Sequence, residues 1–258
     1  MKKSPFLQYV VEHVKGDDKW SLDACFGAAL ESGAFRREEV VCAKTLYNYV
    51  DLGILPIKNM DLPEKTSRNT KTKAVRKNKR ELGRSVEERS ENVDNREEFG
   101  HWEADTVIGK KDENEPCVLV MTERQTRDSI WVKAPSHTAD ALNEAIKAVM
   151  SFFSEKRSEV FKTITVDNGS EFANLPILED DNLKVYFTHP YSSFEKGTVE
   201  CHNRMLRRFI PKGKSIADYT DEQICFFADC INGLPRKILS YRSPTELFDA
   251  QLDALYAV

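Results

Sequence analysis

The sequence predicts an α/β protein in which a mixed five-stranded sheet flanked by helices follows a small all-α domain. Residues 99–258 carry strand-like and helix-like apolar patterns in the order strand, strand, strand, helix, strand, strand, helix. Residues 1–58 carry only helical patterns. A polar and basic stretch at 59–98 separates these two parts, so we predict two domains joined by a linker.

Three short helices are predicted in the first domain, over residues 4–15, 21–31 and 43–52. A tight turn before the last helix is typical of a helix-turn-helix, whose last helix lies in the major groove of DNA. A small bundle that serves only for packing is the alternative. If the third helix binds DNA, the contacts are expected from its outward-facing residues, which are Lys44, Thr45, Tyr47 and Asn48.

The linker prediction for residues 59–98 follows from sparse apolar residues and from Pro63. The net charge of the chain is −4, which by itself argues against nucleic-acid binding. Nine Lys or Arg residues nevertheless lie from Lys65 to Arg84, against the single acid Glu81. This basic run is either a solvated tether or an arm that neutralises DNA phosphates.

The elements of the second domain predict the type of sheet. We expect strands at 101–108, 117–123, 129–134, 161–166 and 184–188. We expect helices at 139–155, from 198 onward and at 221–232. This order is that of a ribonuclease-H-like fold, which is a mixed sheet flanked by helices.

Three carboxylates stand at positions suited to a metal site. Asp167 ends a strand at an Asp-Asn-Gly turn, and Asp105 interrupts an apolar strand, which is costly unless the group is paired or binds metal. Glu200 lies in the first turn of a helix. Carboxylate oxygens are ligands for Mg²⁺, and three such groups can hold two ions. The alternatives are a buried hydrogen-bonded Asp105, a loop-capping Asp167, and Glu195 as the third carboxylate.

The chain resembles a known family at four stretches, which are GHWEADTVIG, TVDNGSEF, HPYSSFEKGTVECHNRMLRRFIPKG and INGLPRKILSYRSPTELF. They resemble the IS-thirty group of bacterial insertion-sequence transposases, within the DDE transposase and retroviral-integrase superfamily. The resemblance implies that Asp105, Asp167 and Glu200 are catalytic and hold two Mg²⁺ (or Mn²⁺) ions. It also implies DNA cleavage and strand transfer at terminal inverted repeats, with double-stranded target DNA as the second substrate.

The sequence departs from the family pattern at two places. Val199-Glu200-Cys201-His202-Asn203 stands where the family commonly has Asn-Glu-Asn-x-Asn, and Phe194-Glu195-Lys196 stands where it often has Trp-Gln-Arg. The family usually carries a further upstream helix-turn-helix that this chain begins too late to contain in full. We therefore expect a truncated copy or a shortened subgroup.

A second DNA-contacting surface is predicted beside the metal site, although a solvated helix face is the alternative. Its residues are Lys196, Asn203, Arg204, Arg207, Arg208, Lys212 and Lys214. We expect Glu103 and Glu171 to face solvent or to support the ligands rather than bind metal. His101, His189 and His202 are too scattered to form a zinc site, and the six cysteines are expected to be reduced.

These features favour a cytoplasmic, nucleoid-associated bacterial transposase that acts on DNA as a homo-oligomer. No run of about 18 apolar residues predicts a membrane span. Two other functions are kept open. One is an impaired transposase remnant that binds DNA as a regulator, and the other is a ribonuclease-H-type nuclease acting on RNA–DNA hybrids.

Overall fold

The computed structural model describes residues 4–17, 19–63, 82–110, 115–189 and 196–257. The chain divides into two compact units. One unit comprises Met1–Val75 and Gly233–Leu247, and the other comprises Arg76–Asn232 and Phe248–Val258. Residues 64–81, which include most of the basic run from Lys65 to Arg84, lie outside the described residues.

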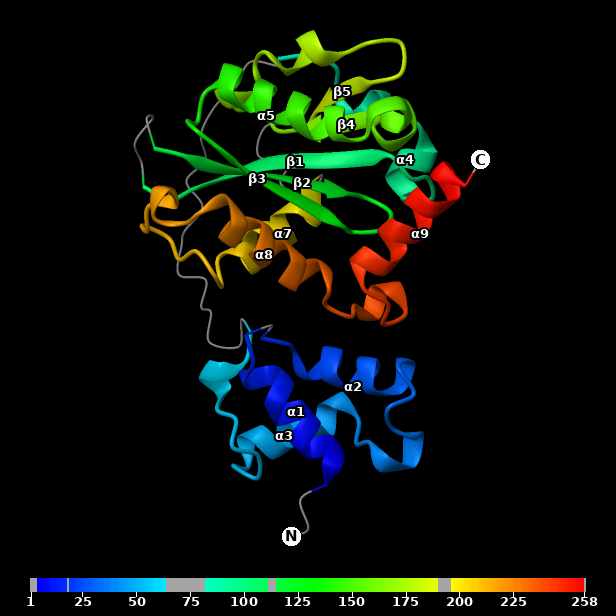
Figure 1. The fold of residues 1–258 in the computed structure, drawn as a ribbon, viewed down its shortest axis with the longest axis vertical. Coiled ribbons are helices and arrows are strands. Elements are labelled where there is room, and N and C mark those ends of the chain that lie inside the picture. Colours follow the sequence, from blue (N-terminus) through cyan, green and yellow to red (C-terminus); the bar gives the residue numbers. More distant parts are fainter. Residues whose placement is uncertain (1–3, 18, 64–81, 111–114, 190–195, 258) are drawn as a thin grey trace. The chain divides into compact units, whose positions relative to one another are not determined.

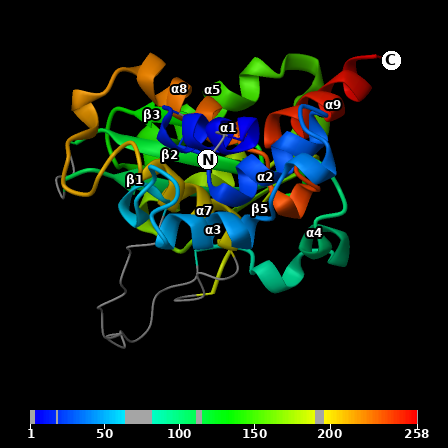
Figure 2. The same ribbon diagram turned by 90° about the horizontal axis from the view of Figure 1, so that it is seen from below.

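The N-terminal unit contains the three predicted helices, α1 (Pro5–Lys15), α2 (Leu22–Glu31) and α3 (Ala43–Asp51). The three helices lie side by side (Figures 1 and 2). Each turns an apolar stripe inward, and the shared core includes Phe6, Val10, Leu22, Cys25 and Leu46. The helical prediction for this part of the chain is therefore confirmed.

Residues Gly233–Leu247 group with the N-terminal helices, whereas we predicted them in the catalytic domain. The ring of Tyr241 packs on α2, with its centroid 6.3 Å from that of Phe26. Gly27 makes this approach possible, because a Cβ atom at that position would collide with the Tyr241 ring. This contact joins residues far apart in the sequence, so no local pattern predicted it.

The second unit is built on one mixed sheet of five strands, in the order β3-β2-β1-β4-β5. β1 pairs antiparallel with β2 and β2 with β3, while β1 pairs parallel with β4 and β4 with β5. The predicted mixed five-stranded sheet is thus confirmed. The strands are β1 (His101–Ile108), β2 (Cys117–Glu123), β3 (Ser129–Ala134), β4 (Thr163–Val166) and β5 (Lys184–Phe187).

Helices cover both faces of this sheet. α5 (Ala139–Phe152) lies on one face, and α7 (Gly197–Leu206) and α8 (Asp221–Asn232) lie on the other (Figure 1). The core under α5 is apolar and fully buried, with Trp102, Leu119, Met121, Leu142 and Ile146 among its members. This burial is the main stabilising contribution to the unit.

Two segments carry structure that the sequence analysis did not predict. Residues 82–98, expected to be linker, contain the short helix α4 (Glu91–Asn95), and the backbone N–H of Phe187 donates to the carbonyl of Arg84 at 2.7 Å. The C-terminal helix α9 (Pro244–Tyr256) places Phe248 against the ring of Trp102, with centroids 5.9 Å apart. Both segments are held by contacts with distant residues.

The remaining elements are short. They are α6 (Arg157–Val160) and the 3₁₀ turns η1 (Arg37–Glu39), η2 (Asn59–Asp61), η3 (Val86–Glu88), η4 (Ser154–Lys156), η5 (Ser170–Phe172), η6 (Leu175–Leu178), η8 (Ile216–Asp218) and η9 (Lys237–Leu239). None of the helices in the described ranges is long and apolar enough to cross a membrane.

Candidate active site

Asp105 and Asp167 are carried by neighbouring strands of the sheet. β1 and β4 pair in parallel, and their last pair is Glu103 opposite Thr165. Asp105 comes two residues after Glu103, and Asp167 comes two residues after Thr165. Asp105 lies within β1, just past its last pair with β4, and Asp167 directly follows the carboxyl end of β4. The Asp105 side chain is 20% exposed and that of Asp167 is 44% exposed, so solvent reaches both.

Local hydrogen bonds orient both carboxylates. Oδ2 of Asp105 accepts from the side-chain amide of Asn203 at 2.7 Å, and Oδ1 accepts from the backbone N–H of Thr106 at 2.9 Å. Oδ1 of Asp167 accepts from the backbone N–H of Gly169 at 2.9 Å. The turn after β4 thus holds Asp167 through its own backbone, whereas Asp105 is held by a side chain from α7.

The ammonium group of Lys196 lies between the two aspartates. Nζ is 3.4 Å from Oδ1 of Asp105 and 3.9 Å from Oδ2 of Asp167, and it donates to the carbonyl of Ala104 at 3.3 Å. Lys196 itself is only 3% exposed. The two carboxylates therefore face one buried positive charge, and this pairing compensates the cost of burying the ammonium group.

Glu200 is half-buried in the first turn of α7. Among the described residues, no three His, Cys, Asp or Glu side chains are close enough together to hold a metal ion. The structure therefore brings Asp105 and Asp167 together at Lys196 but does not gather Glu200 with them. The alternative third carboxylate, Glu195, lies outside the described residues.

The predicted basic surface follows α7 and the residues after it. Arg204, Lys212 and Lys214 are exposed, while Arg207 and Arg208 are half-buried. One Arg207 amino group donates to the carbonyl of Ile108 at 2.8 Å, and partial burial lowers the pKa of its guanidinium. Asn203 and Lys196 differ from this group, because both contact Asp105 instead of facing open solvent.

On α3, the four residues predicted to contact DNA differ in exposure. Lys44 and Asn48 are exposed, whereas Thr45 and Tyr47 are half-buried. Tyr47 packs against the core of the N-terminal unit, and desolvation followed by the charge of Asp23 raises the pKa of its hydroxyl. Lys44 and Asn48 are accordingly the residues of α3 best placed to meet a partner.

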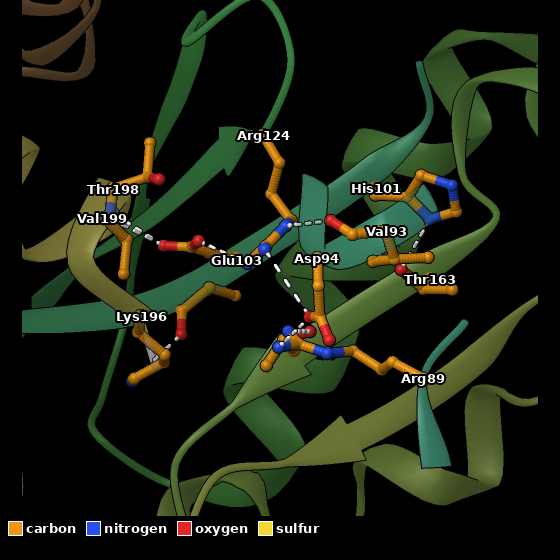
Figure 3. Close-up of polar contacts among 12 residues, drawn as sticks. Arg89, Val93, Asp94, His101, Glu103, Arg124, Thr163, Lys196, Thr198 and Val199 are labelled. Carbon is orange, nitrogen blue, oxygen red and sulfur yellow. Dashed lines mark hydrogen bonds and ion pairs between the residues drawn. The ribbon is translucent and has the colours of Figure 1, made fainter. Parts of the chain in front are cut away.

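Two places were expected for Glu103, one facing solvent and one supporting the metal ligands, and the structure excludes the first. Glu103 is fully buried and bonded to Arg124 and to the start of α7, so it does not face solvent (Figure 3). A charged residue inside the apolar run of β1 was the signal that could have identified Glu103.

The other flanking glutamate is Glu171. It lies 3.5 Å from Nε2 of His137, and this nitrogen is also 2.9 Å from Oγ1 of Thr106.

Each of the three histidines named in the sequence analysis has a different partner. Nδ1 of His101 is 2.9 Å from Oγ1 of Thr163 at the start of the strands, and burial lowers the pKa of its imidazole. His189 pairs with Glu87 at 3.4 Å, and Nδ1 of His202 bonds to the carbonyl of Thr198 within α7. All six cysteines are free thiols.

The chain is similar to known integrases and transposases. Residues 95–193 match the family model described as "Integrase core domain". The chain is 41% identical over 210 residues to the "Probable transposase for insertion-like sequence element IS1161" of Streptococcus salivarius, covering 81% of this chain and 59% of that protein. It is 33% identical over 168 residues to the "Transposase InsI for insertion sequence element IS30A" of Escherichia coli (strain K12), covering 65% of this chain and 42% of that protein.

The chain thus spans about half the length of these two curated relatives. Among solved structures, the catalytic core domain of BIV integrase matches with a TM-score of 0.42 at 16% identity, covering 60% of this chain and 97% of that one. The integrase core model, the mixed five-stranded sheet and the transposase relatives lead to one assignment. The chain belongs to the IS-thirty family of insertion-sequence transposases, within the DDE transposase and integrase superfamily.

Proposed function

We propose that this chain catalyses metal-dependent DNA cleavage and strand transfer at the terminal inverted repeats of an insertion sequence. The observation that carries the proposal is the convergence of Asp105 and Asp167, from neighbouring strands of an integrase core domain, on one positive charge. The names of the relatives, which are transposases of insertion sequences, support the same reaction class.

The donor set suits a hard divalent cation such as Mg²⁺ or Mn²⁺. Carboxylate oxygens are the ligands these ions prefer. The Lys196 ammonium group shows that Asp105 and Asp167 together already bind one positive charge. In the proposal Asp105, Asp167 and Glu200 hold two ions. When bound, the ions supply activation of the attacking oxygen and stabilisation of charge on the phosphate.

The proposed reaction has two chemically similar steps. Water first attacks the phosphodiester at the end of the element, and the bond between phosphorus and the 3′ oxygen breaks. This leaves a 3′-hydroxyl on the element and a 5′-phosphate on the flanking DNA. The 3′-hydroxyl then attacks a target phosphodiester, which forms a new P–O bond and releases the 3′-hydroxyl of the target. Asn203 keeps the Asp105 carboxylate oriented during both steps.

DNA binding is proposed for two surfaces. Lys44 and Asn48, with Thr45 and Tyr47 beside them, would read the terminal repeat from α3. The surface near the site would contact the DNA backbone through Arg204, Arg207, Arg208, Lys212 and Lys214, with Asn203 beside them. Lys196 reaches DNA only after it leaves the two aspartates, so its proposed DNA contact depends on metal binding. Pairing of two element ends favours a homo-oligomer on DNA, in the bacterial cytoplasm where this DNA lies.

A cleavage and strand-transfer assay tests the proposal. The intact chain and Asp167→Asn are incubated with DNA that ends in the element's repeat, with Mg²⁺ or Mn²⁺. We expect 3′-end cutting and joined products from the unaltered protein and neither from the variant. Specific repeat binding without cutting by both proteins would contradict the enzyme assignment and support a DNA-binding regulator.

A further inference from the structure

Glu103 is a fully buried carboxylate two residues before Asp105 on β1. Side chains two residues apart on a strand point to the same face of a sheet, so both carboxylates face α7. Burying a carboxylate is strongly unfavourable unless every oxygen is paired. The partners of Glu103 therefore show what this residue holds in place.

One oxygen of Glu103 is paired with Arg124. The distance from Nη1 of Arg124 to Oε1 of Glu103 is 2.7 Å, and the Arg124 side chain is 4% exposed. Nε of Arg124 donates to the carbonyl of Val93 at 3.2 Å, and Asp94 lies at 4.0 Å (Figure 3). The guanidinium group is itself held on two sides, so it fixes the Glu103 carboxylate in one orientation.

The other oxygen of Glu103 binds the first turn of α7. Oε2 accepts from the backbone N–H of Thr198 at 3.0 Å and from that of Val199 at 2.9 Å (Figure 3). The first N–H groups of a helix have no partner within the helix, and the positive end of the helix dipole favours an anion there. The N-cap residue of α7, Lys196, supplies no side-chain cap, so Glu103 supplies one from the sheet.

The capped turn is the one that carries Glu200. Val199, whose N–H binds Glu103, directly precedes Glu200, and Asp105 lies two residues along the strand from Glu103. Nη1 of Arg127 adds a bond to Oγ1 of Thr198 at 3.1 Å from the hairpin between β2 and β3. The start of α7 is thus fixed relative to the strand that carries one of the candidate metal ligands.

We propose that Glu103 is a positioning residue that sets the location of Glu200 relative to Asp105 by capping α7 from β1. This inference rests on the proposed function, since it assigns Glu103 to the assembly of the metal site. Glu103 does not bind the ions itself, because both of its oxygens are engaged by Arg124 and by the helix. Arg124 acts through Glu103 by holding the carboxylate against the helix.

The chain offers a matched control in Glu123, which is also fully buried. Its carboxylate accepts from the backbone and hydroxyl of Thr126 at 2.6 and 2.8 Å and from the backbone N–H of Gly100 at 3.2 Å. These partners hold the β2–β3 hairpin and the start of β1. Glu123→Gln therefore alters a second fully buried carboxylate without touching the cap of α7.

The test compares Mn²⁺ affinity, measured by titration calorimetry, for the unaltered chain, Glu103→Gln, Glu123→Gln and Asp167→Asn. We expect both buried-glutamate variants to lose stability, but only Glu103→Gln to bind Mn²⁺ about tenfold to a hundredfold more weakly. Glu103→Asp keeps the charge that Arg124 requires and shortens the reach by one methylene. It should fold and still bind Mn²⁺ more weakly than the unaltered chain.

Amide hydrogen exchange over Thr198 and Val199 measures the cap without metal. Faster exchange there in Glu103→Asp and Glu103→Gln, but not in Glu123→Gln, supports the inference. Unchanged exchange and unchanged Mn²⁺ affinity in the Glu103 variants overturn it. If Asp167→Asn binds Mn²⁺ as well as the unaltered chain, the proposed metal site fails, and that result is distinct from failure of the cap.

Discussion

Nζ of Lys196 lies 3.4 Å from Oδ1 of Asp105, and the lysine side chain is 4% exposed. The same nitrogen is 3.9 Å from Oδ2 of Asp167, so one buried ammonium group links aspartates carried by two neighbouring strands. A metal ion that binds both carboxylates must replace this ammonium group or repel it. A metal ion and the Lys196 ammonium group therefore compete for the carboxylates of Asp105 and Asp167.

Replacing Lys196 with methionine removes the internal cation and keeps a long apolar stem. The two carboxylates then repel each other without compensation, so the free energy of unfolding should fall by about 2 kcal/mol, between the values for exposed and buried pairs. Mn²⁺ affinity should rise about tenfold or more, because a competing positive charge about 4 Å away is gone. Urea denaturation and titration calorimetry measure the two effects.

Lys133→Met is the control for Lys196→Met. Lys133 donates to the carbonyl of Tyr219 at 2.8 Å, so its removal also costs a partly buried hydrogen bond. This variant should lose some stability without a change in Mn²⁺ affinity. An unchanged or weaker Mn²⁺ affinity in Lys196→Met would show that the lysine does not compete with the metal.

Asn203→Ala tests the orientation of Asp105. The variant loses the 2.7 Å hydrogen bond from the asparagine amide, and the carboxylate becomes free to rotate. We expect the strand-transfer rate at saturating DNA to fall about tenfold or more, as for other groups that orient a metal ligand. Raising the Mg²⁺ concentration should restore part of the rate, which a Mg²⁺ titration checks. An undiminished strand-transfer rate at low Mg²⁺ would show that Asn203 does not orient Asp105 for catalysis.

The aspartates could be predicted from sequence because each leaves a local signal. Asp105 interrupts an apolar strand, and Asp167 stands before the Asn168-Gly169 turn. The sheet, α1 to α3, α5 and α8 could be predicted for a similar reason, since their apolar periods are strong.

The long-range hydrogen bonds and ion pairs that position the site could not be predicted from local sequence patterns. The bond from Thr198 to Glu103 joins residues 95 positions apart, and the pairing of Lys196 with Asp105 has the same long-range origin. Helix α4 is held by the bond from Arg124 to the carbonyl of Val93, and the C-terminal helix α9 by the packing of Phe248 on Trp102. Such contacts exist only in the folded chain, so single-sequence patterns carry no trace of them.

The exposed lysines after α7 are expected to contribute to DNA affinity by neutralising phosphates. The double variant Lys212→Gln, Lys214→Gln should weaken DNA binding for all sequences. The slope of log affinity against log salt concentration should become shallower by about 0.9 for each phosphate that is no longer neutralised. Fluorescence anisotropy at several salt concentrations measures this slope. Lys147→Gln on α5, an exposed lysine paired with Glu144 at 2.8 Å on the other face of the sheet, should leave the slope unchanged.

Asn48 tests whether α3 reads sequence. It is exposed, so Asn48→Ala should leave the N-terminal unit folded. We expect the preference for the terminal repeat over scrambled DNA to fall by about 1–3 kcal/mol, the discrimination of a good base contact. Competition binding measures this preference. The control is Asn59→Ala, an exposed asparagine outside α3 whose side chain donates to Asp51, the last residue of α3, at 3.2 Å. Equal loss in both variants would argue against a specific role for α3.

The most direct test of the central claim is a crystallographic Mn²⁺ anomalous measurement, at a Mn²⁺ concentration that supports strand transfer. We expect an anomalous peak bound by oxygens of Asp105 and Asp167, with the Lys196 amine withdrawn from between them. Strand transfer at that Mn²⁺ concentration with Lys196 still between the aspartates, and with no peak beside them, would contradict the account.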